Sequence, residues 1–242
     1  MNEQFGLAHL WAQGDLVTRA VALLLLAMSI ASWWVIVAKA LNLRRQAAQA
    51  RYVEDFWRSE DLRSGLARFG QGDDNAFARL ALDGEAANSE RARLPQLQDA
   101  MGASEWISRC LRNSIDESTA RLQSGLAILA SVGSTAPFVG LFGTVWGIYH
   151  ALLSISSAGQ ASIDQVAGPI GEALVMTALG LAVAIPAVLG YNALVRGNKS
   201  VVARLNRFAH DLHACLLSGA WQRGARAGGS VAAPAVAAVR GA

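Results

Sequence analysis

Charge is scarce in this sequence, and its absence is concentrated in a few places. Asp, Glu, Lys and Arg make up 16% of the 242 residues, whereas soluble domains carry about 25%. Residues 126–195 contain no Lys or Arg and only two acids, Asp164 and Glu172, and residues 20–38 contain no charge at all. Buried helices of soluble proteins rarely run this long without charge, so a soluble protein is disfavoured.

Three apolar runs are long enough to cross a bilayer, which takes about 20 helical residues. In lipid each run must be helical, because unpaired backbone groups find no water to bond. The sequence therefore predicts an all-α integral membrane protein with three transmembrane helices, at 16–38, 126–155 and 166–195. A cleaved signal peptide is disfavoured for the first run, which is too long and lacks a basic start.

Basic residues predict the orientation, since they accumulate in cytoplasmic loops. Arg19 is the only basic residue before residue 39, 13 lie at 39–121, none lies at 156–167, and seven follow residue 195. We therefore expect the N-terminus in the periplasm and the C-terminus in the cytoplasm. The other predicted segments are a periplasmic N-terminal segment (1–15), a cytoplasmic helical domain (39–125), a short periplasmic loop (156–165), a cytoplasmic helix (196–223) and a disordered tail (224–242).

The predicted cytoplasmic domain has a helical composition, with breaks expected near Gly70–Asp74, Asp83–Gly84 and Pro95. No strong breaker follows Pro95, so we expect one continuous helix from there into the second span. After the third span, apolar residues recur every three or four positions, which predicts an amphipathic continuation of that helix. Transmembrane helices 2 and 3 are thus expected to extend into a large cytoplasmic helical domain.

Few residues are suited to catalysis or to metal binding. Cys110 and Cys215 lack metal-ligand spacing and fall on the predicted cytoplasmic side, where a disulfide is disfavoured. The 13 basic residues at 39–121 are matched by 13 acids, which does not favour nucleic-acid binding. No Ser/His/Asp set, Cys/His pair or phosphate loop appears, so we expect no enzyme, no metal and no cofactor.

Small residues form a stripe along each of the last two predicted spans. Spacings of three and four place them on one face of a helix, and each stripe contains one threonine, Thr144 or Thr177. Such faces either let membrane helices pack closely or line a narrow lumen. The residues assigned to pore lining or close packing are Gly133, Gly140, Gly147, Ala151, Ala173, Gly180 and Ala184.

Glu172 is an acid within the third predicted span. Acids inside membrane helices are costly and usually functional, so Glu172 is a candidate for accepting and passing a proton. The alternative is an interfacial position at the outer end of the span, since Glu172 closely follows Asp164 and Pro169.

Antiparallel pairing of the last two spans predicts the relative depth of these residues. Thr144 and Thr177 lie nearly the same number of residues from the centre of their loop, and so at similar depth. Glu172 lies about 7.5 Å nearer the outside than Thr177 and about 140° away on a helical wheel, so the two are not expected to share one face.

Two stretches resemble the ExbB/TolQ family of inner-membrane proton-channel proteins, which is distantly related to the flagellar stator protein MotA. They read GSTAPFVGLFGTVWGIY at 133–149 and AGPIGEALVMTALGLAVAIPAVLGYN at 167–192. The resemblance implies that Glu172, Thr144 and Thr177 are the proton-pathway residues. Met176 departs from the family pattern, in which a smaller residue is usual, and is expected to narrow that face.

The resemblance also implies partners and a role. It implies a homo-pentamer in membrane lipid around a single-span ExbD-like partner, whose proton-driven movement is passed to a TonB-like protein. The first hypothesis is an ExbB-like subunit that harnesses the proton motive force for TonB-dependent transport, including siderophore uptake. The alternatives are a TolQ-like subunit of the Tol-Pal envelope system and, from another class, a non-conducting membrane scaffold.

Overall fold

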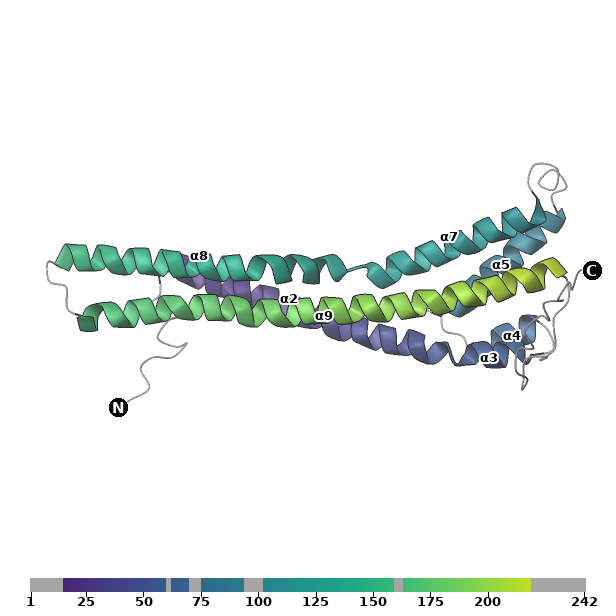
Figure 1. Cartoon of the computed structure of the whole chain (residues 1–242), viewed down its shortest axis with the longest axis horizontal. Helices are drawn as coiled ribbons and strands as arrows, with labels where there is room; N and C mark the ends of the chain where they lie inside the picture. The colour runs from purple at the N-terminus through teal and green to yellow at the C-terminus, as the bar shows by residue number, and fades with distance from the viewer. Residues whose placement is uncertain (1–14, 60–61, 70–74, 94–101, 159–162, 219–242) are drawn as a thin grey trace, which may run out of the picture. The chain divides into compact units, whose positions relative to one another are not determined.

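The computed structural model describes residues 15–59, 62–69, 75–93, 102–158 and 163–218, and every regular element in these ranges is an α-helix. Three helical stretches are long and apolar enough to cross a membrane: Leu16–Trp57, Ala103–Leu153 and Ala173–Ser218. The helices, drawn in Figure 1, are α2 (Leu16–Gln49), α3 (Tyr52–Trp57), α4 (Leu62–Arg68), α5 (Ala76–Arg93), α7 (Ala103–Gln123), α8 (Leu126–Ala158) and α9 (Ile163–Ser218).

The chain divides into two compact units, each built from two segments. The first unit comprises residues 1–45 and 119–200, and the second comprises residues 46–118 and 201–242. The predicted spans therefore lie in the first unit. Two long helices, α2 and α9, each contribute residues to both units.

Helices α2, α8 and α9 pack together in the first unit. Helix α8 is antiparallel to α9, because Gly133 lies against Val188 at one end of their contact and Gly147 lies against Ala173 at the other. Helix α2 is parallel to α9, since Ile36 packs on Gly190 and Leu43 on Gly197. One core cluster of this unit contains Val21, Leu25, Val132, Ala136, Met176, Ala184 and Ala187.

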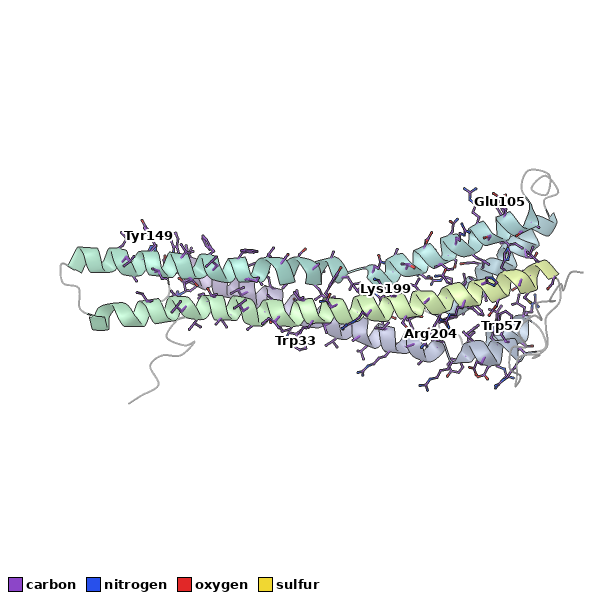
Figure 2. All side chains as sticks on the ribbon, viewed as in Figure 1. Trp33, Trp57, Glu105, Tyr149, Lys199 and Arg204 are labelled. Atoms are coloured by element: carbon purple, nitrogen blue, oxygen red, sulfur yellow. The ribbon has the colours of Figure 1, made fainter. Side chains whose placement is uncertain are left out.

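The outer surface of the first unit is apolar. Trp34 is 75% exposed and Phe138 is 70% exposed, and the side chains of Trp33 and Tyr149 project outward in Figure 2. In water such a surface would favour aggregation, because large contiguous apolar patches are rare on soluble monomers. The three helices are thus apolar both where they touch one another and where they face their surroundings, as expected in a bilayer.

The second unit has an aromatic core. The ring of Phe208 on α9 lies 5.1 Å from that of Phe56, 5.7 Å from that of Trp57 and 5.8 Å from that of Phe77, measured between centroids. These separations are typical of edge-to-face aromatic packing. The amphipathic pattern predicted after the third span therefore serves to pack α9 against this core.

Two sequence-based expectations about helix breaks are wrong. Helix α5 runs through the expected break at Asp83–Gly84. Gly84 is needed there for packing, because a Cβ built on it would lie 3.2 Å from the side chain of Leu111 and 3.1 Å from that of Leu212. The expected continuous helix into the second span is interrupted between Gln123 and Leu126, where Gly125 has φ of +79°.

Several other expectations fall outside the described residues. They are the N-terminal segment up to residue 14, the breaks at Gly70–Asp74 and Pro95, the middle of the loop between the last two spans at 159–162, and the tail at 224–242.

Asn75 supports the start of α5. Its side-chain oxygen accepts hydrogen bonds from the backbone N–H groups of Phe77 (3.0 Å) and Ala78 (3.3 Å). We expect Asn75→Ala to destabilise the first turn of α5 by about 1–2 kcal/mol, since an N-cap acceptor is lost. Amide hydrogen exchange at residues 76–79 should therefore accelerate by roughly 5- to 30-fold. Asn75→Ser, which retains an acceptor, should leave exchange close to its original rate; equal acceleration in both variants would contradict the capping role.

Candidate functional site

The small-residue stripes of α8 and α9 face each other in the first unit. A Cβ built at Gly180 would lie 2.7 Å from the backbone oxygen of Ala136 and 3.1 Å from Cα of Gly140. A Cβ built at Gly140 would lie 2.6 Å from the backbone oxygen of Met176. The two backbones thus approach as closely as they do because neither glycine has a side chain.

Two threonine hydroxyls meet within this contact. Oγ1 of Thr144 lies 2.5 Å from Oγ1 of Thr177, so the two residues lie at the same depth, as antiparallel pairing predicts. Oγ1 of Thr144 also lies 3.2 Å from the backbone oxygen of Gly140 and 3.1 Å from that of Ala173. Thr144 is buried, with 6% of its surface exposed.

The hydrogen-bond count orients these hydroxyls. Each threonine carries one hydroxyl hydrogen, and a backbone carbonyl oxygen can only accept. A consistent arrangement has Thr177 donating to Thr144, while Thr144 donates to the carbonyl oxygen of Gly140 or of Ala173. Each of the two hydroxyls can thus both donate and accept, and Thr144 has a choice of two carbonyl acceptors.

Glu172 lies on α9, immediately before Ala173. Its backbone is helical, and its side chain lies outside the described part of the structure. The next residue is Ala173, whose carbonyl oxygen accepts a hydrogen bond from Oγ1 of Thr144. The candidate proton acceptor is therefore next in the chain to a residue that contacts the hydroxyl pair.

The other stripe residues lie in the same helix–helix contact or are buried nearby. The methyl group of Ala173 faces Gly147, where an added Cβ would be 2.8 Å away. Ala151, Ala173 and Ala184 are buried. Met176 is 2% exposed, and its Cβ would lie 3.1 Å from a Cβ at Gly143. Met176 therefore fills space between α8 and α9 instead of projecting from the surface.

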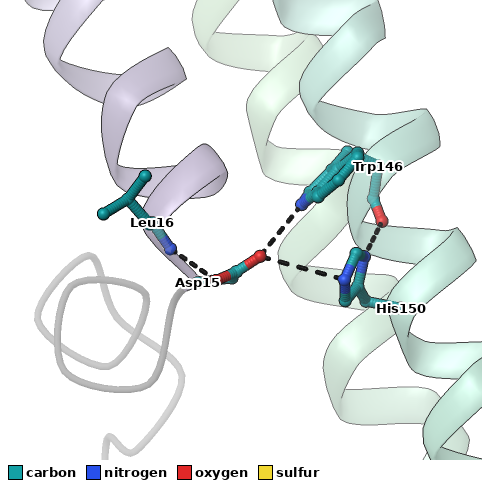
Figure 3. Close-up of polar contacts among 4 residues, drawn as sticks. All are labelled: Asp15, Leu16, Trp146 and His150. Carbon is teal, nitrogen blue, oxygen red and sulfur yellow. Dashed lines mark hydrogen bonds and ion pairs between the residues drawn. The ribbon is translucent and has the colours of Figure 1, made fainter.

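A polar cluster connects the N-terminal end of α2 to the C-terminal half of α8 (Figure 3). This cluster was not predicted from the sequence. Oδ1 of Asp15 accepts from the backbone N–H of Leu16 at 2.7 Å, and Oδ2 accepts from Nε1 of Trp146 at 3.3 Å. Nε2 of His150 lies 3.9 Å from the same oxygen. The available signal was an Asp directly before a long apolar helix, which is typical of a helix N-terminus.

Among the side chains that the structure describes, no three His, Cys, Asp or Glu residues come together as a metal site would require. In the described part of the chain Cys110 and Cys215 are not joined in a disulfide, and both are partly buried.

Sequence comparisons show which known proteins this chain is similar to. The sequence signature of the MotA/TolQ/ExbB proton channel family matches residues 61–207. The chain is 43% identical over 222 residues to the biopolymer transport protein ExbB of Xanthomonas campestris pv. campestris (strain B100), covering 87% of this chain and 88% of the relative.

Two further relatives give the same result. The chain is 44% identical over 211 residues to the biopolymer transport protein ExbB of Neisseria meningitidis serogroup A, covering 85% of this chain and 94% of the relative. It is 36% identical over 209 residues to the Tol-Pal system protein TolQ of Pseudomonas aeruginosa, covering 85% and 90%. With its three apolar helical stretches, the chain is a multi-pass inner-membrane protein that belongs to the MotA/TolQ/ExbB proton channel family.

Proposed function

We propose that this chain is an ExbB-like proton-channel subunit that, with an ExbD-like partner, uses the proton motive force to energise TonB-dependent transport across the outer membrane. The observation that carries the proposal is the buried hydroxyl pair of Thr144 and Thr177. It lies between two helices of small residues, one of which carries Glu172.

The proposed roles follow from the chemistry of these groups. Glu172 accepts a proton that enters from the outside and releases it toward the inside. Thr144 and Thr177 relay it or orient the group that receives it, since each hydroxyl both donates and accepts. One charge that crosses 100 mV releases about 2.3 kcal/mol, which is available for work only if the channel does not leak. The close packing of Gly140 against Gly180 supports a proposed channel that excludes a continuous file of water.

The proposed assembly places the N-terminus in the periplasm and the C-terminus in the cytoplasm, as the basic residues indicate. A homo-pentamer in membrane lipid surrounds the single-span ExbD-like partner, whose movement is passed to a TonB-like protein. The exposed apolar surface of the first unit, which includes Phe138, is available for contacts with lipid and with other copies.

Two alternatives make different predictions. A TolQ-like role has less support, because identity to the TolQ relative is 36%, against 43% and 44% to the two ExbB relatives described above. Loss of growth on iron–siderophore complexes favours the ExbB-like role, whereas detergent sensitivity and chained cells favour the TolQ-like one. The only observation that favours a non-conducting scaffold is the close contact between the glycines of α8 and α9. A scaffold predicts that Thr144, Thr177 and Glu172 can be replaced without loss of function.

Thr144→Val tests the proposal, because valine has the same shape as threonine but no hydroxyl. We expect TonB-dependent siderophore uptake to fall at least tenfold, since general acid–base and proton-transfer groups typically contribute factors of about 10²–10⁴. Thr144→Ser, which keeps the hydroxyl, should retain most of the uptake. Uptake is measured in a strain that lacks the chromosomal copy, with equal amounts of each variant in the membrane. Full uptake with Thr144→Val would remove the proposed role of the hydroxyl pair.

A further inference from the structure

The break between α7 and α8 is bonded to two other helices. Helix α7 ends at Gln123 and α8 begins at Leu126, with Gly125 between them at φ of +79°. Glycine adopts this left-handed conformation readily, and a glycine between two helices is normally a flexible point. The last carbonyl groups of a helix have no following N–H group within it to accept from, and are satisfied by other donors.

Lys39 on α2 supplies one donor. Its ammonium nitrogen lies 3.0 Å from the carbonyl oxygen of Arg121 and 2.8 Å from Oγ of Ser124. The hydroxyl of Ser124 donates in turn to the carbonyl oxygen of Arg121, at 2.8 Å. A cation at this position also complements the partial negative charge of a helix C-terminus.

Asn198 on α9 supplies the other donor. Its side-chain amide donates to the carbonyl oxygen of Leu122 at 3.0 Å, and Asn198 is buried, with 8% of its surface exposed. A buried donor of this kind is costly to leave unpaired, so its bond to Leu122 is strongly specified. Successive carbonyl groups of α7 are therefore bonded from two different helices, and we call this set of bonds the α7 cap.

From this arrangement we infer that Lys39 and Asn198 are positioning residues that turn a flexible glycine break into a stiff joint. The last turn of α7 follows α2 and α9, because a displacement of either helix moves a donor that the carbonyl groups of α7 need. Helix α7 is continuous from Ala103 to Gln123, and residue 119 begins the part of it that belongs to the first unit. The joint thus transmits movement of the apolar helices along the chain instead of absorbing it at Gly125.

Hydrogen exchange of the full-length protein in lipid nanodiscs tests this inference. In the double variant Lys39→Met, Asn198→Leu we expect amide exchange at residues 119–124 to accelerate at least tenfold, since both outside donors are lost. Exchange at residues 176–190 of α9 should stay unchanged, which shows that the helix contact is intact. Lys199→Met, which removes an exposed cation next to Asn198, is the matched control and should have no effect at 119–124.

Single variants keep the test valid if the double variant does not fold. Lys39→Met leaves the bond from Asn198 in place, and we expect a smaller acceleration, about threefold, confined to residues 119–124. Lys39→Arg should restore the original rate. An unchanged rate at 119–124 in Lys39→Met would overturn the inference. The inference rests on the proposed function and adds to it a route by which movement is transmitted. Hydrogen exchange at this joint is measured without proton flow, so the inference about the joint and the proposed function can each fail independently of the other.

Discussion

Gly180→Ala is expected to destabilise the protein, although alanine is the better helix former by about 1 kcal/mol. The added methyl group would lie 2.7 Å from the backbone oxygen of Ala136 and within 3.3 Å of the backbone of Gly140. These are backbone atoms, so no side-chain rotation relieves the clash, and α8 and α9 must move apart. Overpacking of this kind costs about 1–3 kcal/mol. The hydroxyl contact between Thr144 and Thr177 should weaken with it.

Gly171→Ala is the matched control for this prediction. Gly171 lies on the same helix, and a Cβ built there meets no described atom outside its own helical backbone within 4 Å. The same chemical change should therefore be neutral or slightly stabilising. Thermal unfolding of the two variants in one detergent gives the comparison: Gly180→Ala should lower the midpoint by several degrees relative to Gly171→Ala. Equal midpoints would mean that the close approach of α8 and α9 does not hold the helices together.

Glu172→Gln is expected to abolish TonB-dependent uptake, to a tenth of the original rate or less, at unchanged protein level. Glutamine has nearly the shape of glutamate but cannot ionise at any working pH. Under the proposed function, a proton then has no group to bind in the third span. Glu172→Asp, which retains an ionisable carboxyl group, should keep part of the activity.

Asp164→Asn is the control for a general loss of negative charge. Asp164 and Glu172 are the only acids in residues 126–195, and we expect the loss of Asp164 to leave most of the uptake. The scaffold alternative predicts that Glu172→Gln and Asp164→Asn behave alike. Normal uptake with Glu172→Gln would therefore rule out proton coupling through this residue.

Much of the candidate site could be predicted from local pattern. The long stretches without charge identify the apolar helices, because burying charge in lipid is costly whatever the neighbours are. Spacings of three and four place Gly140, Thr144 and Gly147 on one face, because helix geometry alone determines this. The equal depth of Thr144 and Thr177 follows from a short connection between antiparallel helices.

The helix breaks could not be predicted in the same way. Asp83–Gly84 has the composition of a helix break, yet α5 continues through it. Leucine side chains from distant positions pack against Gly84, and Asp83 accepts a hydrogen bond from Ser114 at 2.6 Å. Gly125 has no neighbouring proline to mark it. Lys39, which bonds to Arg121 and Ser124 just before this glycine, is 82 and 85 positions away from them in the sequence. Contacts between remote residues decide which glycine ends a helix.

Composition and spacing alone were enough to identify three apolar helices, a small-residue face with one threonine on two of them, and Glu172 as the acid within residues 166–195. These features depend on composition and on helix periodicity, which are local. The packing of the two faces on each other, the hydrogen bond between Thr144 and Thr177, and the capping of α7 by Lys39 and Asn198 became visible in the folded chain alone. These features depend on distances between helices, which are set by how closely glycine lets their backbones approach.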